Sequence, residues 1–357
     1  MGKLALTGGG RCNISNDFST VKSLEEVYPR GSVLMKRGLK RFGVEQTLEW
    51  FAGRGVRFVT EDGGRIFPAS QDAMQIVRTL LRATEGAKYE FGRRLESLPD
   101  AETTVLTTGG GPGMKILEGL PVEVASPVPS LFGLDLSKSE GTRQTPLAGL
   151  EGISCEAALS IPGTKFRSEG SLLITKSGLS GPAALRLSSY AARHLAENGY
   201  RSPLMIRWFT GDEALLRAQM DAFRQNNPQK HVSRLHPEGI AQRLWEYLLT
   251  ESGIAPGRTW AELGSKGLNR LVQTLLAWPC HICGKTRYSE EFVTCGGVSL
   301  QSIELNTMEC KGRPGLYFAG EILDVDAVTG GFNLQAAWTT AAIAAHSIIA
   351  KYDTQNL

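Results

Sequence analysis

Residues 315–340 read GLYFAGEILDVDAVTGGFNLQAAWTT, and their pattern predicts a strand, a loop and a helix in succession. Its first six residues are mostly apolar and β-prone and end in glycine, which is typical of a buried strand. An acidic loop follows, and after Gly330 and Gly331 an alanine-rich segment over 336–350 has high helix propensity. A helix that begins at Gly-Gly presents free backbone N–H groups and the positive end of its dipole, which suits an anionic or electron-rich ligand. An ordinary strand-to-helix turn is the alternative interpretation.

Glycine is frequent, at 41 of 357 residues, and three further clusters lie at Gly8–Gly10, Gly109–Gly111 and Gly296–Gly297. Such clusters mark backbone that takes positive φ or that another group approaches closely. One cluster alone favours a tight turn, whereas four clusters beside regular segments favour a bound ligand. Arg11 follows the first cluster and can form a bidentate pair with a phosphate or carboxylate. We interpret Cys12 as a small packed residue rather than as a redox thiol.

Five motifs together resemble one known family. The sequence reads TGGGRCNISN at 7–16, EDGGRIFP at 61–68, LLITKSGLSGPAALRLSSYAAR at 172–193 and VTCGGVSL at 293–300, in addition to the stretch at 315–340. These motifs resemble the FAD-dependent flavoproteins of the aminoacetone oxidase or BaiN type, which are also described as NAD(P)/FAD-dependent oxidoreductases. The resemblance covers nearly the whole chain.

The resemblance implies an α/β fold: an incomplete glutathione-reductase-like FAD-binding domain of Rossmann type, with an inserted β-barrel-like domain and a helical subdomain. The FAD-binding domain would comprise 1–125 and 297–357. The β-rich insertion would span 126–210, the helical subdomain 211–280, and a return strand of the β-rich domain 281–296.

The resemblance also implies which residues contact FAD. The loop after Thr7 would pass close to the flavin, and the helix start after Gly330 would face its ring, where a helix N-terminus stabilises the charge of the reduced form. The implied cofactor residues are Gly8, Gly9, Gly10, Arg11, Cys12, Asn13, Thr108, Gly109, Gly320, Glu321, Asp324, Gly330, Gly331, Phe332, Asn333, Leu334 and Gln335. Arg65 is a weaker candidate for a substrate contact, and a solvated turn residue is its alternative. The sequence identifies no catalytic acid or base.

The sequence departs from the family pattern in one respect. The family begins with a strand, a G-x-G-x-x-G turn and a helix before the TGGGRCN loop, and this sequence contains no G-x-G-x-x-G in such a context. Roughly 40–50 residues of the expected fold are therefore missing, judged from the usual length of a βαβ unit. We consider a start codon assigned too late, a truncated chain, and a remnant with a defective FAD site.

Periodicity indicates the organisation of the remaining segments. Apolar spacing predicts helices over 24–42, 44–53 and 71–84, and the Asp62-Gly63 pair predicts a hairpin over 61–68. Short strands are expected within 126–210, and helices within 211–280. Cys280 and Cys283 form a C-x-x-C, but no second ligand pair accompanies them and they follow a helical segment. We therefore predict neither a metal site nor a redox disulfide.

Net charge and composition argue against several classes of partner and location. The net charge of 39 − 36 = +3 argues against a nucleic-acid partner or a membrane surface. No apolar run reaches the roughly 18 residues of a membrane span. The N-terminus lacks a signal-peptide pattern and cysteines are sparse, so we expect a cytoplasmic protein. The sequence does not indicate an oligomeric state.

The resulting functional prediction is a flavin-dependent oxidoreductase that binds FAD, with NAD(P)H as a candidate reductant. Its substrate would be a small organic molecule that undergoes amine oxidation or enone reduction. The alternative is a truncated flavoprotein without FAD that acts as a non-catalytic scaffold or interaction protein.

Overall fold

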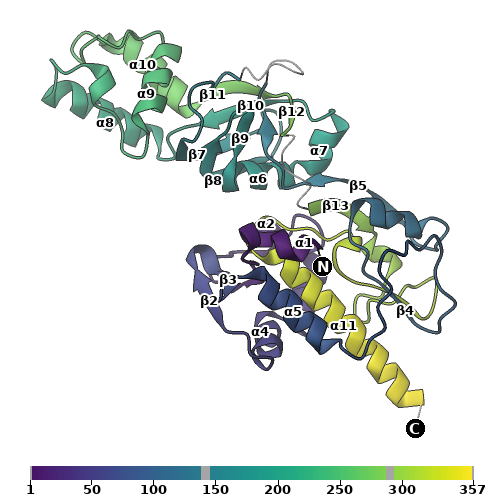
Figure 1. Cartoon of the computed structure of the whole chain (residues 1–357). Helices are drawn as coiled ribbons and strands as arrows, with labels where there is room; N and C mark the ends of the chain where they lie inside the picture. Colours follow the sequence, from purple (N-terminus) through teal and green to yellow (C-terminus); the bar gives the residue numbers. More distant parts are fainter. Residues whose placement is uncertain (1, 138–144, 287–292, 356–357) are drawn as a thin grey trace. The chain divides into compact units, whose positions relative to one another are not determined.

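The computed structural model describes residues 2–137, 145–286 and 293–355, and the chain folds into two compact units. Unit 1 comprises Met1–Pro129 and Val293–Leu357, and unit 2 comprises Ser130–Phe292 (Figure 1). Both contain helices and strands, which confirms the α/β class. Every residue predicted to contact the cofactor lies in unit 1, so unit 1 determines the geometry of the candidate site.

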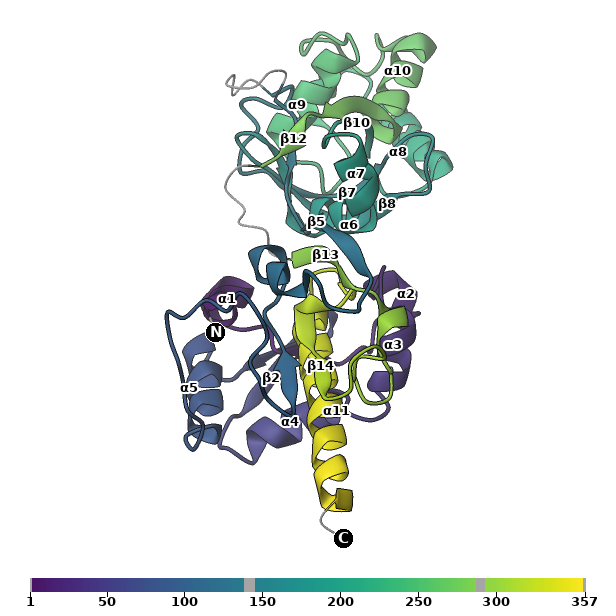
Figure 2. The same ribbon diagram turned by 90° about the vertical axis from the view of Figure 1, so that its right-hand side faces the viewer.

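The stretch at 315–340 folds as its pattern predicts. Strand β14 (Leu316–Phe318) is fully buried and pairs in parallel with β4 (Thr104–Leu106). Helix α11 (Phe332–Gln355) follows and lies alongside β14 (Figure 2). Because a parallel pair directs both carboxyl ends to the same edge, the loops after Leu106 and Phe318 emerge together.

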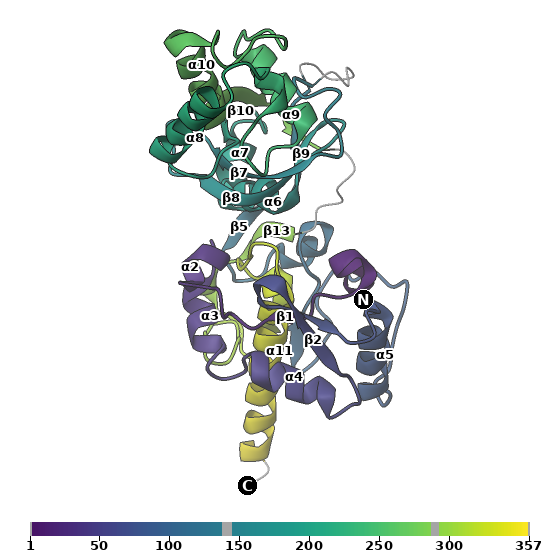
Figure 3. The same cartoon turned by 90° about the vertical axis from the view of Figure 1, so that its left-hand side faces the viewer.

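A small antiparallel sheet lies beside α11 (Figure 3). Its strands are β1 (Ser15–Asn16), β3 (Arg65–Pro68) and β2 (Phe58–Glu61), in the order β1-β3-β2. The turn between β2 and β3 includes Gly63 at φ 74°, a conformation that glycine adopts readily. The predicted hairpin at 61–68 is confirmed.

Short helices cover this sheet and α11. The predicted helix over 24–42 is interrupted, because Pro29 disfavours helical backbone before it and Gly31 has φ 79°. Helix α5 has the predicted amphipathic character, and Asp72 caps it by accepting a hydrogen bond from the Met74 N–H at 2.8 Å. The helices are α1 (Gly2–Leu6), α2 (Leu24–Val27), α3 (Ser32–Gly38), α4 (Val44–Ala52) and α5 (Ala73–Ala83).

The segment predicted as the return strand, 281–296, runs across the boundary between the two units, which follows Phe292. Residues 287–292 lie outside the described residues. Strand β13 (Val293–Val298) belongs to unit 1 and pairs with β5 (Val124–Ser130). The remaining short 3-10 turns of unit 1 are η1 (Thr7–Gly10), η2 (Asp62–Gly64), η3 (Gly111–Leu117), η5 (Leu300–Ser302) and η6 (Gly320–Ile322).

Unit 2 contains a seven-stranded sheet in the order β11-β10-β7-β8-β9-β6-β12. Its two end strands are consecutive in sequence and are separated by Cys283 alone, so the segment Trp278–Lys285 pairs with β10 through one half and with β6 through the other. The strands are β6 (Leu134–Asp135), β7 (Ser154–Ser160), β8 (Arg167–Ile174), β9 (Gly178–Ser180), β10 (Ser202–Arg207), β11 (Trp278–Ile282) and β12 (Gly284–Lys285).

Helices in unit 2 pack around a large apolar core that includes the fully buried Trp245 and Trp260. Helices form within 211–280 as expected, and Trp260–Leu263 is a turn that leads into α10. The helices are α6 (Gly181–Tyr190), α7 (Ala192–Glu197), α8 (Glu213–Asn226), α9 (Gln242–Glu251) and α10 (Gly264–Leu276), with the 3-10 turn η4 (Val232–Arg234).

The described residues contain no cluster of three or more His, Cys, Asp or Glu residues that could hold a metal ion. Cys280 is buried in β11, and Cys283 follows it with a free thiol. Across the same residues, no helix combines the length and apolar character that a membrane span requires.

Candidate functional site

The loop after α1 has an unusual backbone. Gly8, Gly9 and Gly10 take φ values of 59°, 68° and 83°, which is a run of left-handed residues that only glycine accommodates without strain. The loop closes when the Cys12 N–H donates to the Thr7 carbonyl at 3.0 Å. A Cβ atom added at Gly9 or Gly10 would meet no other atom within 4 Å, so both glycines border open space. The loop can therefore accept a close ligand.

Arg11 is held against the β2–β3 hairpin. Its Nη1 donates to Glu61 Oε1 at 2.9 Å and to Gln71 Oε1 at 3.0 Å, and its guanidinium carbon lies 4.2 Å from the Phe67 ring centroid. Arg65 shares the same glutamate, with Nη2 at 3.7 Å from Glu61 Oε2. Both arginine side chains remain about two-fifths exposed. The structure thus brings the two predicted arginines together around one carboxylate.

The loop reaches the start of α11 through Asn13 and Asn16. With its amide oriented to satisfy its neighbours, Asn13 donates to Ser15 O at 2.9 Å and accepts from the Gly331 N–H at 3.1 Å. Asn16 Nδ2 donates to the Gly330 carbonyl at 3.0 Å. A Cβ atom on Gly331 would lie 2.2 Å from Ser15 O, so the two backbones touch directly. The two predicted halves of the site therefore meet.

A buried hydrogen-bond network holds the contact between the loop at Gly8–Asn16 and the start of α11 in place. Ser15 Oγ donates to Gln335 Oε1 at 2.6 Å, and Gln335 Nε2 donates to Thr47 Oγ1 at 3.1 Å and to Thr339 Oγ1 at 3.0 Å. The two threonine hydroxyls in turn donate to the carbonyls of Gly43 and Phe42, both at 2.8 Å. All four side chains are buried, and such groups are costly unless paired. Gln335 therefore orients the first turn of α11.

The first turn of α11 keeps free backbone donors. The first intrahelical bond runs from the Gln335 N–H to Gly331 O at 3.0 Å. The N–H groups of Phe332, Asn333 and Leu334 have no acceptor among residues 2–137, 145–286 and 293–355. Together with the helix dipole they form a positive end suited to an anionic or electron-rich edge.

The side chains of this turn have structural partners. Asn333 Oδ1 accepts from the Ala327 N–H at 2.9 Å and its Nδ2 donates to Ala327 O at 2.8 Å, which closes the loop before the helix. Phe332 packs edge-on against Phe18, and Tyr28 OH donates to the Phe332 carbonyl at 2.9 Å. What Asn333 and its neighbours offer a ligand is therefore backbone N–H rather than side-chain amide.

A second group of predicted residues gathers at the ends of β4 and β14. Glu321 Oε2 accepts from Lys3 Nζ at 2.9 Å, and its Oε1 accepts from the Thr294 N–H at 2.9 Å. A Cβ atom on Gly109 would lie 3.4 Å from Glu321 Oε2. The Gly320 N–H donates to Thr340 Oγ1 of α11 at 2.9 Å. Helices α1 and α11 thus connect this group to the loop at Gly8–Asn13.

The loop between Gly320 and α11 contains a buried ion pair. Arg30 Nε donates to Asp326 Oδ1 at 2.6 Å, its Nη2 also reaches the carboxylate, and Asp326 is fully buried. Burial by itself lowers the pKa of Arg30, but the hydrogen bonds and charge of Asp326 outweigh it, with a smaller contribution from Asp324, and the net pKa is raised. The negative charge of Asp324 therefore also stabilises the charged form of Arg30. The backbone N–H of Asp324 donates to Val298 O at 2.9 Å.

Cys12 is buried at φ 60°, in agreement with its interpretation as a packed residue. Burial raises its pKa to about 11, and a weaker hydrogen bond with Thr7 opposes the shift. The unfolded thiol ionises near 9.0, so between these values the unfolded chain releases a proton that the folded chain retains.

We therefore expect stability to fall as pH rises through this window. Urea unfolding at about pH 8 and about pH 10.5 should show a loss about 2 kcal/mol larger in the parent protein than in Cys12→Ala. Thiols elsewhere contribute equally to both proteins and cancel in the difference. Equal losses in the two proteins would contradict the burial of an un-ionised Cys12.

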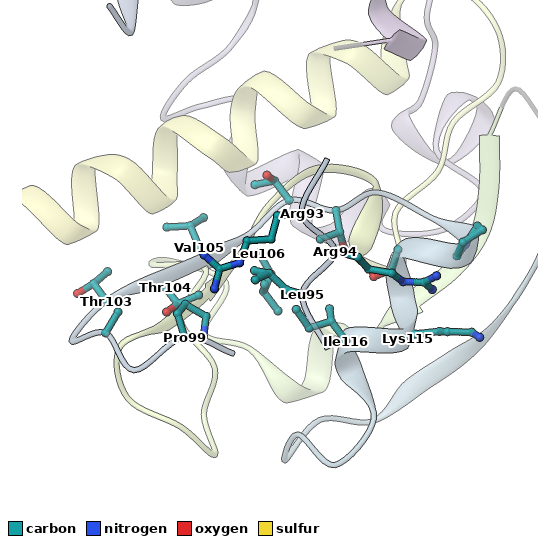
Figure 4. A pocket seen from close by; sticks show the side chains of 15 residues that line it. Arg93, Arg94, Leu95, Pro99, Thr103, Thr104, Val105, Leu106, Lys115 and Ile116 are labelled. Carbon is teal, nitrogen blue, oxygen red and sulfur yellow. The ribbon is translucent and has the colours of Figure 1, made fainter. Parts of the chain in front are cut away.

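A cavity of about 610 Å³ lies along β4 (Figure 4). Thr108 lines it, but none of the residues Gly8–Asn13 or Gly330–Gln335 does. The sequence did not single out Lys3, Asn16, Tyr28, Arg30, Glu61, Gln71 or Asp326. Asn16, Glu61 and Asp326 stand inside the quoted motifs at 7–16, 61–68 and 315–340. Lys3, Tyr28, Arg30 and Gln71 carry no local signal, because their roles arise from long-range contacts.

The chain is similar to known proteins over nearly its whole length. Residues 1–347 match the family described as "HI0933-like protein Rossmann domain". The chain is similar to the "Ribosomal RNA dihydrouridine synthase" of Escherichia coli, at 29% identity over 98% of this chain and 89% of that protein. It is also similar to the "3-dehydro-bile acid delta(4,6)-reductase" of Clostridium scindens, at 26% identity over 96% and 88%, respectively. The "Ribosomal RNA dihydrouridine synthase" of Haemophilus influenzae matches at 26% identity over 97% and 89%.

Proposed function

The chain belongs to the HI0933-like Rossmann-domain family, and on that premise we propose that it is a flavin-dependent oxidoreductase that binds FAD between the loop Gly8–Asn13 and the N-terminus of α11. The observation that carries this proposal is the direct contact of Asn13 and Asn16 with Gly331 and Gly330. This contact places a glycine loop that borders open space beside a helix start with three free N–H groups. A flavin requires both a close backbone approach and stabilisation of negative charge.

Each element of the site has a defined role in this proposal. The N–H groups of Phe332, Asn333 and Leu334 would bind the electron-rich edge of the isoalloxazine, and Gln335 would hold them in place. Gly9 and Gly10 would let the ring approach the loop. Thr108, Gly109 and Gly320 would line the part of the site that extends toward the diphosphate.

The names of the relatives support a proposal for the substrate class. A dihydrouridine synthase and a delta(4,6)-reductase are both, by name, enzymes that reduce a carbon–carbon double bond. We propose the same bond class here, with a conjugated carbonyl compound as substrate and NAD(P)H as reductant, and we favour it over amine oxidation. A reduced flavin, when bound, would supply the hydride. Arg11 and Arg65, both partly exposed at the hairpin, would orient an anionic part of the substrate.

The test begins with the visible absorption of the purified chain after incubation with FAD and removal of excess ligand. We expect the bands of oxidised flavin, their bleaching by NAD(P)H without oxygen, and their return when a conjugated enone is added. A uridine-containing rRNA fragment, tested in parallel, distinguishes a nucleic-acid substrate from a small molecule. A chain that takes up no flavin would instead support the alternative of a non-catalytic scaffold.

A further inference from the structure

Asn16 connects two segments that lie far apart in the sequence. Its Nδ2 donates to the Gly63 carbonyl, in the turn between β2 and β3, at 2.9 Å, and to the Gly330 carbonyl, before α11, at 3.0 Å. Asn16 is only 1% exposed, and its amide NH2 group has two protons, so each carbonyl receives one of them. One buried side chain therefore holds both the hairpin turn and the start of α11.

The hairpin turn rests directly on this amide. Gly64 has φ 73°, and a Cβ atom added there would lie 2.9 Å from Asn16 Oδ1, closer than a Cβ atom normally approaches. Arg65, which pairs with Asn16 in the register of β1 and β3, donates from its Nε to Asp62 O at 3.0 Å. This bond ties the Arg65 guanidinium to the same turn. A change at Asn16 should therefore reach Arg65 through the turn.

Asn16 also holds the loop beside the start of α11. Phe18 has φ 60°, a conformation that is unfavourable for a residue with a side chain. Asn16 Oδ1 stabilises this conformation by accepting a hydrogen bond from the Phe18 N–H at 2.8 Å. The Phe18 ring lies edge-on to the ring of Phe332, with 5.1 Å between the centroids. Strained backbone of this kind persists only where the surroundings hold it, and it concentrates at functional sites.

We propose that Asn16 is a positioning residue that couples flavin binding at α11 to substrate binding at the hairpin. Both of its amide protons are used, so it acts through the two carbonyls rather than on a ligand. A flavin that orders Phe332–Leu334 would then also order the turn that supports Arg65, and the affinity for an anionic substrate would rise. This inference rests on the proposed function and adds the link between its two ligands.

Hydrogen exchange of the full chain, followed by mass spectrometry with and without FAD, tests the link. In the parent protein we expect FAD to slow exchange about fivefold or more, both at 332–334 and in the turn at 62–65. In Asn16→Ala we expect the effect at 332–334 to remain and the effect at 62–65 to disappear. Loss of the effect at both segments alike would overturn the proposal, because it would show a general weakening of the fold.

Gly64→Ala provides a second variant that leaves Asn16 intact. Its added Cβ would force the turn and the Asn16 amide apart, so we expect the same loss of the FAD effect at 62–65. Gly55→Ala is the matched control, because Gly55 also has positive φ, at 82°, and a Cβ atom there would meet no atom within 4 Å. It should respond to FAD as the parent protein does.

Ligand affinity provides the second measurement. Cyclohexenone and the same ring carrying a carboxylate are titrated onto the oxidised, flavin-loaded chain, and the change in flavin absorbance is followed. We expect the parent protein to bind the carboxylate about fivefold or more tightly than the neutral ring, and Asn16→Ala and Gly64→Ala to lose this preference. A fold that is only weakened would lose affinity for both rings equally.

A parent protein without the preference for the carboxylate would overturn the inference. So would an Asn16→Ala variant that keeps either this preference or the FAD effect at 62–65. A chain that takes up no flavin would instead overturn the proposed function, and the inference with it.

Discussion

Gly331→Ala is expected to abolish flavin binding and to lower the free energy of unfolding by about 3 kcal/mol. Gly331 has φ 96°, and its added Cβ would lie 2.2 Å from Ser15 O and 2.5 Å from Ser15 C. These are backbone atoms of β1, so no flexible side chain can move aside. The first turn of α11 must therefore shift away from the Asn13 loop, and both halves of the proposed site separate.

Gly55→Ala is the matched control for this variant. Gly55 also has positive φ, at 82°, but an added Cβ would meet no atom within 4 Å. It therefore reports the backbone strain alone, about 1–2 kcal/mol, and should leave flavin affinity unchanged. Chemical denaturation and flavin titration measure the two quantities. Gly331→Ala with the flavin affinity of the parent protein would show that the contact between β1 and α11 is irrelevant to binding.

Arg30→Met is expected to cost about 3–5 kcal/mol of unfolding free energy, because it leaves the fully buried Asp326 carboxylate without its guanidinium. Asp326 lies in the loop that leads into α11, and the Asn333 side chain closes the end of the same loop on Ala327. We therefore expect flavin affinity to fall together with stability.

The double variant Arg30→Met with Asp326→Leu tests the physical cause. Removing both charges eliminates the buried carboxylate that has lost its guanidinium, so the double variant should recover most of the stability that Arg30→Met loses. Urea denaturation of the two single variants and the double variant gives the coupling between the residues. If Arg30→Met lowers the free energy of unfolding by less than about 1 kcal/mol, the Arg30–Asp326 ion pair contributes no more than an exposed ion pair does.

Local pattern was sufficient to predict the strand, loop and helix at 315–350. A buried apolar run, a Gly-Gly pair and an alanine-rich segment each specify their own backbone, and β14 and α11 form where these signals stand. The segment 24–42 shows the limit of periodicity. Its apolar spacing is helical throughout, but Pro29 and Gly31 interrupt the backbone and separate α2 from α3.

Side-chain roles at the site were harder to predict than its location. The loop at Gly8–Asn13 and the start of α11 meet, as the family resemblance implied. Gln335 and Asn333 carry polar groups at the helix start, yet Gln335 is buried and Asn333 bonds its own loop. Each polar group takes whichever partner the tertiary fold brings near, and a sequence does not show which distant hydroxyls, such as Ser15 and Thr47, will be there.

Joint binding of flavin by the first turn of α11 and the glycine loop can be followed by NMR, through backbone amide resonances during titration with FAD. We expect the amides of Gly9, Gly10, Phe332, Asn333 and Leu334 to shift together at one affinity and to become protected from hydrogen exchange. Flavin binding that leaves the amides of Phe332–Leu334 unchanged would show that the ligand lies elsewhere.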